Sequence, residues 1–224
     1  MPSSKIKSVF VCQNCGYESL RWLGRCPSCG GWNALVETPK IEPAGKREKR
    51  QLAPMVSLEK VSLEGKEKKP TGLEELDRVL GGGLVAGGVI LLAGEPGIGK
   101  STLLLQVAQK IAGRGGKVVY VCGEESPLQI KLRANRLGVL GQNLMLLPET
   151  DVDIVAQTLG GEKLALVIVD SIQTMTTVDL AGGAGSVGQV KECARRLILW
   201  AKESQTPLFL VGHVTKEGAI AGPK

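Results

Sequence analysis

The pattern of apolar and polar residues from about residue 89 onward alternates between short and long segments. Apart from Lys117 at the start of one and Asp170 at the end of another, the short segments are apolar, which is typical of strands buried on both faces of a sheet. They cover residues 89–93, 117–122, 144–147, 164–170 and 208–212. The long segments repeat apolar residues at helical spacing and cover residues 101–112, about 127–137 and about 187–202. Strands that alternate with helices predict an α/β fold with a central, mainly parallel sheet.

Two predicted helices begin with capping patterns. Thr71 is followed three residues later by Glu74, which is the spacing of a capping box, and this predicts a helix from there to the glycines at 81–83. Ser126 followed by Pro127 predicts the start of the helix over 127–137, because serine caps helices and proline suits their first turn.

The loop after the first apolar segment has the spacing G-x-x-x-x-G-K-[ST] between a strand and a helix, the context in which this motif binds nucleotide phosphates. Its glycines let backbone N–H groups surround an anion at the positive end of the helix dipole. Lys100 is expected to reach the β- and γ-phosphates, and the Ser101 hydroxyl to ligate Mg²⁺. We therefore expect ATP to bind at Gly94, Glu95, Pro96, Gly97, Ile98, Gly99, Lys100, Ser101 and Thr102.

Polar residues end three of the later apolar segments. Asp170 ends a buried strand, the pattern that delivers a carboxylate to the shell of a magnesium ion. Glu124 or Glu125 is expected to act with Lys100 in catalysis by orienting or deprotonating the attacking water; the alternative is that both are exposed loop charges. His213, the one histidine, either senses the γ-phosphate or is structural.

Two C-x-x-C pairs stand near the start of the chain, formed by Cys12, Cys15, Cys26 and Cys29. At this spacing four thiolates can surround Zn²⁺, and about forty residues need such a staple because they cannot bury a sufficient core. Two disulfides or a redox-active pair are the alternatives. Four cysteine ligands leave no open coordination position, so the zinc is expected to be structural.

Aromatic residues gather in this cysteine-containing segment. They either pack around the metal as a small core or, beside Arg21 and Arg25, stack on single-stranded bases. The residues are Phe10, Tyr17, Trp22 and Trp32.

Composition divides the chain into a zinc module at 1–38, a charged linker at 39–70 and an ATPase core at 71–224. Hydrophobic residues make up 43% of the chain, which is enough for a core, and no apolar run approaches the length of a membrane span. Without an export signal, a reducing cytoplasm is expected. The net charge of +6 is compatible with nucleic acid but does not establish it.

A glycine-rich stretch follows residue 174 and precedes a helix with basic residues. It is expected either to contact a phosphate backbone or to be an unconstrained surface loop. The candidate DNA-binding residues are Gly182, Gly183, Gly185, Lys191 and, after the last strand, Lys216.

The joint pattern of these motifs resembles the bacterial DNA-repair ATPase family RadA, also called Sms. The resemblance covers essentially the whole chain. It rests on the four-cysteine module, the charged linker and the stretches T-G-L-x-E-L-D, G-E-P-G-I-G-K-S-T, V-C-G-E-E-S, V-D-S-I-Q-T and G-H-V-T-K-E-G.

This resemblance implies a RecA-like P-loop NTPase core, a homo-hexameric ring and a DNA-dependent ATPase that binds single-stranded DNA. It implies branch migration of recombination intermediates, with a recombinase such as RecA as partner. By position it assigns Lys100, Ser101 and Thr102 to phosphates and Mg²⁺, and Glu124 or Glu125 to catalysis. It places Asp170 in the magnesium shell, His213 in the region of a γ-phosphate sensor, and 182–188 and 215–224 in DNA-facing segments.

The chain departs from this family in lacking a K-N-R-F-G motif and a Lon-protease-like domain. The core is therefore expected to be incomplete at its C-terminus and to hydrolyse ATP poorly by itself. Two other functions are considered: a nucleotide-switched assembly protein similar to KaiC, and a zinc- and nucleotide-binding module that recruits proteins without hydrolysis.

Overall fold

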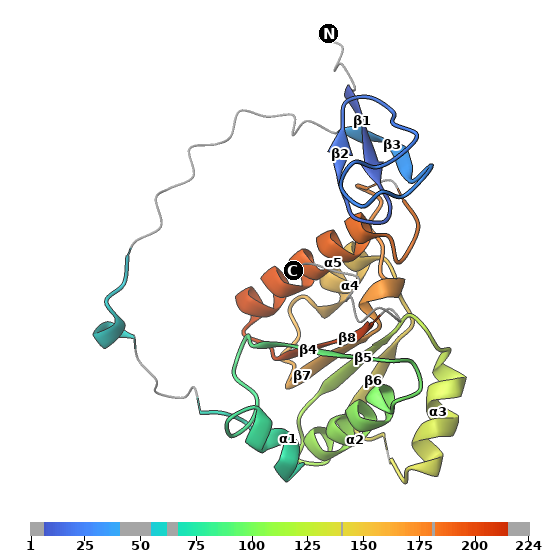
Figure 1. The fold of residues 1–224 in the computed structure, drawn as a ribbon. Coiled ribbons are helices and arrows are strands. Elements are labelled where there is room, and N and C mark those ends of the chain that lie inside the picture. Colours follow the sequence, from blue (N-terminus) through green and yellow to red (C-terminus); the bar gives the residue numbers. More distant parts are fainter. Residues whose placement is uncertain (1–6, 41–54, 62–66, 140, 181, 215–224) are drawn as a thin grey trace. The chain divides into compact units, whose positions relative to one another are not determined.

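The computed structural model describes residues 7–40, 55–61, 67–139, 141–180 and 182–214 (Figure 1). Contacts divide the chain into two compact units, Met1–Glu67 and Lys68–Lys224. Lys216 and the segment 215–224, which were expected to face DNA, lie outside the described residues.

The first unit contains a small antiparallel sheet in the order β2-β1-β3. Its core holds Cys12, Cys26, Ala34 and Leu35, with Phe10 packed against them. A short 3-10 helix, η1 (Leu58–Lys60), follows further along and is exposed. The strands are β1 (Lys7–Cys12), β2 (Glu18–Ser19) and β3 (Leu35–Lys40).

The second unit is built on a five-stranded parallel sheet in the order β4-β8-β7-β5-β6, which confirms the predicted α/β fold. All five strands lie where apolar segments predict them. They are β4 (Val89–Gly94), β5 (Val118–Cys122), β6 (Leu144–Leu147), β7 (Leu166–Asp170) and β8 (Leu208–His213).

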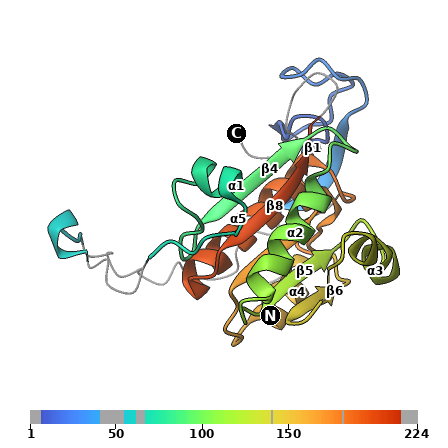
Figure 2. The same cartoon turned by 90° about the horizontal axis from the view of Figure 1, so that it is seen from below.

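Helices cover both faces of this sheet, with α1 and α2 on one side and α4 and α5 on the other (Figure 2). Helix α4 and the 3-10 helix η2 have no counterpart among the sequence predictions. The helices are α1 (Glu74–Val79), α2 (Lys100–Ala112), α3 (Pro127–Arg136), α4 (Val152–Leu159), η2 (Ile172–Thr174) and α5 (Val187–Ser204).

The central strands are buried on both faces because their side chains alternate between two apolar clusters. On β5, Tyr120 faces the cluster under α2, whereas Val119 and Val121 face the cluster under α5. On β8, Phe209 and Leu210 alternate in the same way. This explains why the strands read as unbroken apolar runs rather than as alternating patterns.

Helix α1 begins differently from the prediction. Its N-cap is Leu73, which has no side-chain cap, so the capping box from Thr71 to Glu74 is wrong. Thr71 lies two residues ahead of the N-cap position. The backbone N–H groups of Thr71 (2.7 Å) and Gly72 (3.2 Å) instead donate hydrogen bonds to the Asp77 carboxylate. The predicted Ser126 cap of α3 is confirmed.

Within the described part of the chain, we find no helix with the length and apolar character needed to cross a membrane.

Candidate functional site

The carboxyl ends of the parallel strands bring the predicted nucleotide residues to one edge of the sheet. Gly94 at the end of β4 pairs with His213 on β8, and Cys122 at the end of β5 pairs with Asp170 on β7. A cavity of about 360 Å³ opens at this edge. It is lined by Pro96, Gly97, Gly99, Lys100, Ser101, Thr102, Glu124, Glu125, Arg133, Asp170 and His213.

The backbone of the phosphate loop, residues 94–101, adopts conformations that favour glycine. Gly97 and Gly99 have φ values of 82° and 101°, a region that residues with a Cβ rarely adopt. Lys100 is 7% exposed, and its Nζ donates to the carbonyl oxygens of Gly94 (2.9 Å) and Glu95 (2.8 Å). Its ammonium group is thus held at the cavity by neutral acceptors that phosphate oxygens can replace. Ile98 points away, with 71% of its surface exposed.

Oxygen ligands suited to Mg²⁺ meet at the end of β7. Asp170 is only 6% exposed, and its Oδ2 accepts a hydrogen bond from the Tyr120 hydroxyl (2.5 Å). Its Oδ1, like the hydroxyl of Ser171, is buried without a hydrogen-bond partner among the described residues. Because a buried carboxylate oxygen is costly to leave unpaired, Oδ1 fits a metal-bound water or the ion itself, together with the Ser101 hydroxyl.

Burial is the main cause of the raised pKa of the Tyr120 phenol, and the charge of Asp170 and the hydrogen bond to it raise it further. A hydrogen bond with the Ser101 side chain acts in the opposite direction but is outweighed. The phenol therefore remains a neutral donor at physiological pH.

The paired glutamates have different partners. The Glu125 carboxylate forms an ion pair with the guanidinium of Arg133 on α3. The Glu124 carboxylate lies 2.9 Å from Nε2 of His213, and half of its side chain (51%) is exposed. Both glutamates line the cavity. Arg133 was not among the predicted site residues.

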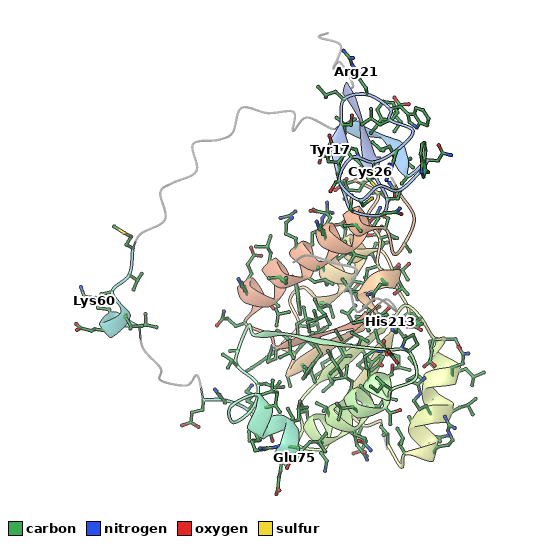
Figure 3. All side chains as sticks on the ribbon, in the orientation of Figure 1. Tyr17, Arg21, Cys26, Lys60, Glu75 and His213 are labelled. Carbon is green, nitrogen blue, oxygen red and sulfur yellow. The ribbon has the colours of Figure 1, made fainter. Side chains whose placement is uncertain are left out.

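Figure 3 shows His213 at this edge of the sheet. Its backbone carbonyl accepts a hydrogen bond from Nε2 of Gln173 (3.3 Å), in the turn that follows Asp170. A Cβ placed on Gly185 would lie 3.7 Å from the Gln173 carbonyl oxygen. The glycine-rich loop, which lies between η2 and α5, therefore passes next to Gln173, and Gln173 contacts the end of β8 that carries His213.

The glycine-rich loop is fixed at its start by Gln189 of α5, which is 1% exposed. Its Oε1 accepts from the backbone N–H of Thr177 (2.8 Å). Its Nε2 donates to the carbonyl oxygens of Thr177 (3.0 Å), Leu180 (2.7 Å) and Gly182 (3.2 Å). The loop is thus attached to the helix on which Lys191 is exposed.

Both arginines of α5 have acidic partners. Arg195 pairs with Glu192, and Arg196 pairs with Asp153, Asp179 and Glu192. The hydrogen bond from Arg195, opposed by burial and supported by Arg196, lowers the pKa of Glu192 to about 2. Among the described residues Lys191 has no ion pair, so it is more available to a phosphate than either arginine.

In the first unit, ligand atoms of the four predicted cysteines lie within 4.8 Å of one another. The Sγ atoms of Cys12 and Cys29 are 3.6 Å apart, as are those of Cys15 and Cys26. Sulfurs placed tetrahedrally about 2.3 Å from a zinc ion lie roughly 3.8 Å apart, so the cluster fits Zn²⁺. All four are free cysteines, which argues against the disulfide alternative.

The thiols of Cys12 and Cys26 do not ionise equally. Burial raises the pKa of Cys12 to about 12. For Cys26 burial acts in the same direction, but hydrogen bonds from the backbone of Cys29 and Ser28 and from neighbouring thiols outweigh it and lower the pKa to about 7. Holding Cys12 as a thiolate near neutral pH therefore requires a cation in the cluster.

The aromatic residues around the cysteines do not form one core. Phe10 packs against the cysteine cluster, but Trp22 and Trp32 are 55% and 73% exposed. The packing alternative is therefore wrong for both tryptophans, since the cysteines, Ala34 and Leu35 already fill the small interior. The Arg25 guanidinium lies 5.8 Å from the centre of the Trp32 ring.

Models of known families match segments in both units. Residues 58–219 match the family described as AAA domain. The chain belongs to this AAA domain family. The first unit of this AAA-domain chain carries a second match, to the family described as Rubredoxin metal binding domain, over residues 10–37.

Similar curated proteins are DNA repair proteins called RadA, which confirms the family resemblance. The AAA-domain chain is 52% identical to the one from Aquifex aeolicus over 98% of its length, 47% identical to the one from Bacillus subtilis over 99%, and 44% identical to the one from Campylobacter jejuni over 99%. These alignments cover 49%, 50% and 50% of the relatives, so the chain spans about half their length.

Proposed function

We propose that this chain is the ATP-binding unit of a DNA-repair motor that binds single-stranded DNA and drives branch migration of recombination intermediates. The observation that carries the proposal is the cavity in which Lys100, Ser101, Asp170 and the paired glutamates converge at the strand ends. The similar proteins named DNA repair protein RadA support the link to repair.

In this proposal the cavity residues have separate roles in ATP hydrolysis. Lys100 exchanges its carbonyl acceptors for oxygens of the β- and γ-phosphates, and Ser101 and Asp170 hold Mg²⁺, which neutralises phosphate charge when bound. Glu124 is assigned as the group that orients or deprotonates water, because the Glu125 carboxylate is held in an ion pair with Arg133, whereas Glu124 is half exposed beside His213. His213 positions Glu124 and responds to the occupied site.

Contact with DNA is assigned to the glycine-rich loop and to Lys191. Gly182, Gly183 and Gly185 let a phosphate backbone approach closely, and the exposed ammonium of Lys191 supplies charge. The proximity of Gln173 to both His213 and Gly185 offers a physical connection from the nucleotide to this loop. A homo-hexameric ring and a recombinase such as RecA are the proposed assembly and partner.

The test is fluorescence anisotropy of a labelled single-stranded oligonucleotide without nucleotide, with ADP and with a slowly hydrolysed ATP analogue. We expect binding to depend on the nucleotide and to disappear in Lys100→Ala. Binding that ignores the nucleotide would contradict an ATP-switched motor and point to a passive tether. Nucleotide-dependent assembly without DNA binding would instead favour a KaiC-like switch.

The two glutamates provide a matched pair for the catalytic step. Glu124→Gln is expected to lower ATP turnover by at least 100-fold while nucleotide binding persists, since general-base catalysis typically contributes about 10²–10⁴-fold. Glu125→Gln is expected to have a smaller effect, acting through Arg133. The assignment fails if Glu125→Gln is the more damaging change.

A further inference from the structure

Tyr120 places a hydroxyl inside an otherwise apolar part of the sheet. It lies in the middle of β5, every residue of which is buried, and is itself 1% exposed. Its ring packs in the apolar cluster under α2. A phenylalanine would fill almost the same volume, so packing alone does not account for the hydroxyl.

The register of the sheet directs this hydroxyl to the magnesium-binding edge. Tyr120 is paired with Ile168 and Cys122 with Asp170, so Tyr120 and Asp170 are diagonal neighbours on adjacent strands. Diagonal neighbours on the same face are within reach of a long aromatic side chain. The Tyr120 hydroxyl donates to Asp170 Oδ2 at 2.5 Å.

This bond makes the two oxygens of Asp170 unequal. Oδ2 is occupied by the phenol, whereas Oδ1 is buried and has no hydrogen-bond partner among the described residues. A carboxylate fixed through one oxygen presents the other in one orientation, as partners behind metal ligands do in known metal sites. Ser101, the second candidate magnesium ligand, lines the same cavity.

We propose that Tyr120 is a positioning residue for Mg²⁺: its hydroxyl holds Asp170 through Oδ2 so that Oδ1 faces the metal shell. The inference rests on the proposed function, because it requires that the cavity bind nucleotide with Mg²⁺. It adds a residue that neither the phosphate-loop pattern nor the acid at the end of β7 identifies.

The test is the Mg²⁺ dependence of binding of a fluorescent ATP analogue, with each protein also measured in excess EDTA. Tyr120→Phe is expected to raise the Mg²⁺ concentration for half-maximal enhancement by about 10-fold or more, in line with losses of other partners behind metal ligands. Its binding in EDTA is expected to match wild type, because the phosphate loop is unchanged.

Thr206→Val is the matched control. Thr206 is also buried, at 3% exposure, and lies just before β8, at the opposite end of that strand from His213. This variant removes a buried hydroxyl with little change in volume, and it is expected to leave the Mg²⁺ dependence unchanged.

A double-mutant cycle tests whether Tyr120 acts through Asp170. In an Asp170→Asn background, Tyr120→Phe is expected to change the Mg²⁺ dependence by less than about threefold.

Three other outcomes would contradict either the positioning role of Tyr120 or the proposed function. A Mg²⁺ dependence of Tyr120→Phe within twofold of wild type overturns the positioning role. Equal loss of binding with Mg²⁺ and in EDTA also overturns it, because the hydroxyl would then support the fold generally. If wild type binds the analogue with no response to Mg²⁺, the proposed function fails and this inference fails with it.

Discussion

Gln189 provides the sharpest test of how the glycine-rich loop is held. Gln189→Met keeps the side-chain length and apolar stem but removes the amide that makes four hydrogen bonds to the backbone of Thr177, Leu180 and Gly182. The variant is therefore expected to weaken the fold by leaving backbone groups without partners rather than by opening a cavity.

The magnitude follows from which of these groups water can reach. Thr177 is 3% exposed, so its N–H and carbonyl both lose their partner inside the protein, at about 1–3 kcal/mol each. Leu180 is only partly buried, and its carbonyl can bind water instead. The expected loss is about 2–6 kcal/mol, which at an m-value of about 2 kcal/mol/M lowers the urea midpoint by roughly 1–3 M.

The assay is urea unfolding followed by circular dichroism, which reports on the second unit because α1–α5 all lie there. Gln106→Met, the same exchange at an exposed position of α2, is the control and is expected to move the midpoint little. A midpoint shift for Gln189→Met no larger than that of the control would refute the reasoning, because it would show that the loop is not held by these bonds.

Three further predictions concern the metal, pH and strand packing. Cys26→Ser is expected to lose the zinc of the first unit while leaving nucleotide binding intact, as measured by metal release to a coloured chelator and by analogue binding. Because arginine hydrogen bonds lower the pKa of Glu192 from 4.5 to about 2, its stabilisation is complete above about pH 4.5 and is lost as the pH falls towards 2. Glu192→Gln should therefore be less stable than wild type at pH 7, and unfolding at a series of pH values should show the difference shrinking through that window. Gly123→Ala is expected to lower the thermal midpoint, because a Cβ there would lie 2.2 Å from Oγ1 of Thr174, whereas Gly183→Ala, with nothing within 4 Å, should not.

The strands of the second unit could be predicted because burial on both faces leaves a strong pattern in the sequence. The phosphate loop and Asp170 could be predicted for a related reason: their roles require fixed residue types at fixed positions after a strand. Helix α4 was missed although Asp151 caps it and Val152, Val155 and Leu159 are buried, because the helix is short. The sequence of a helix of about two turns is difficult to distinguish from that of a loop when its packing against the sheet is not known.

Other site residues could not be found from the sequence because tertiary pairing selects them. Arg133 reaches Glu125 from the next helix, and Tyr120 reaches Asp170 across two neighbouring strands. Nothing in the spacing of either residue predicts these contacts. For Trp22 and Trp32 the sequence suggested a contact that the structure does not contain. Packing around the cysteines was considered for both, but other residues already fill the small core.

The parallel arrangement of the strands also creates an end of the second unit that is suited to attached probes. The turns before β6 and β7 lie at the amino ends of the strands, whereas the cavity lies at their carboxyl ends. A Cβ at Gly141 or Gly161 would meet nothing within 4 Å, although both residues have a positive φ. Insertion of a short cysteine-bearing peptide at either turn, rather than substitution of the glycine, would give a fluorophore a site remote from the nucleotide cavity. Single-molecule experiments could then follow the unit without disturbing the chemistry that they are meant to observe.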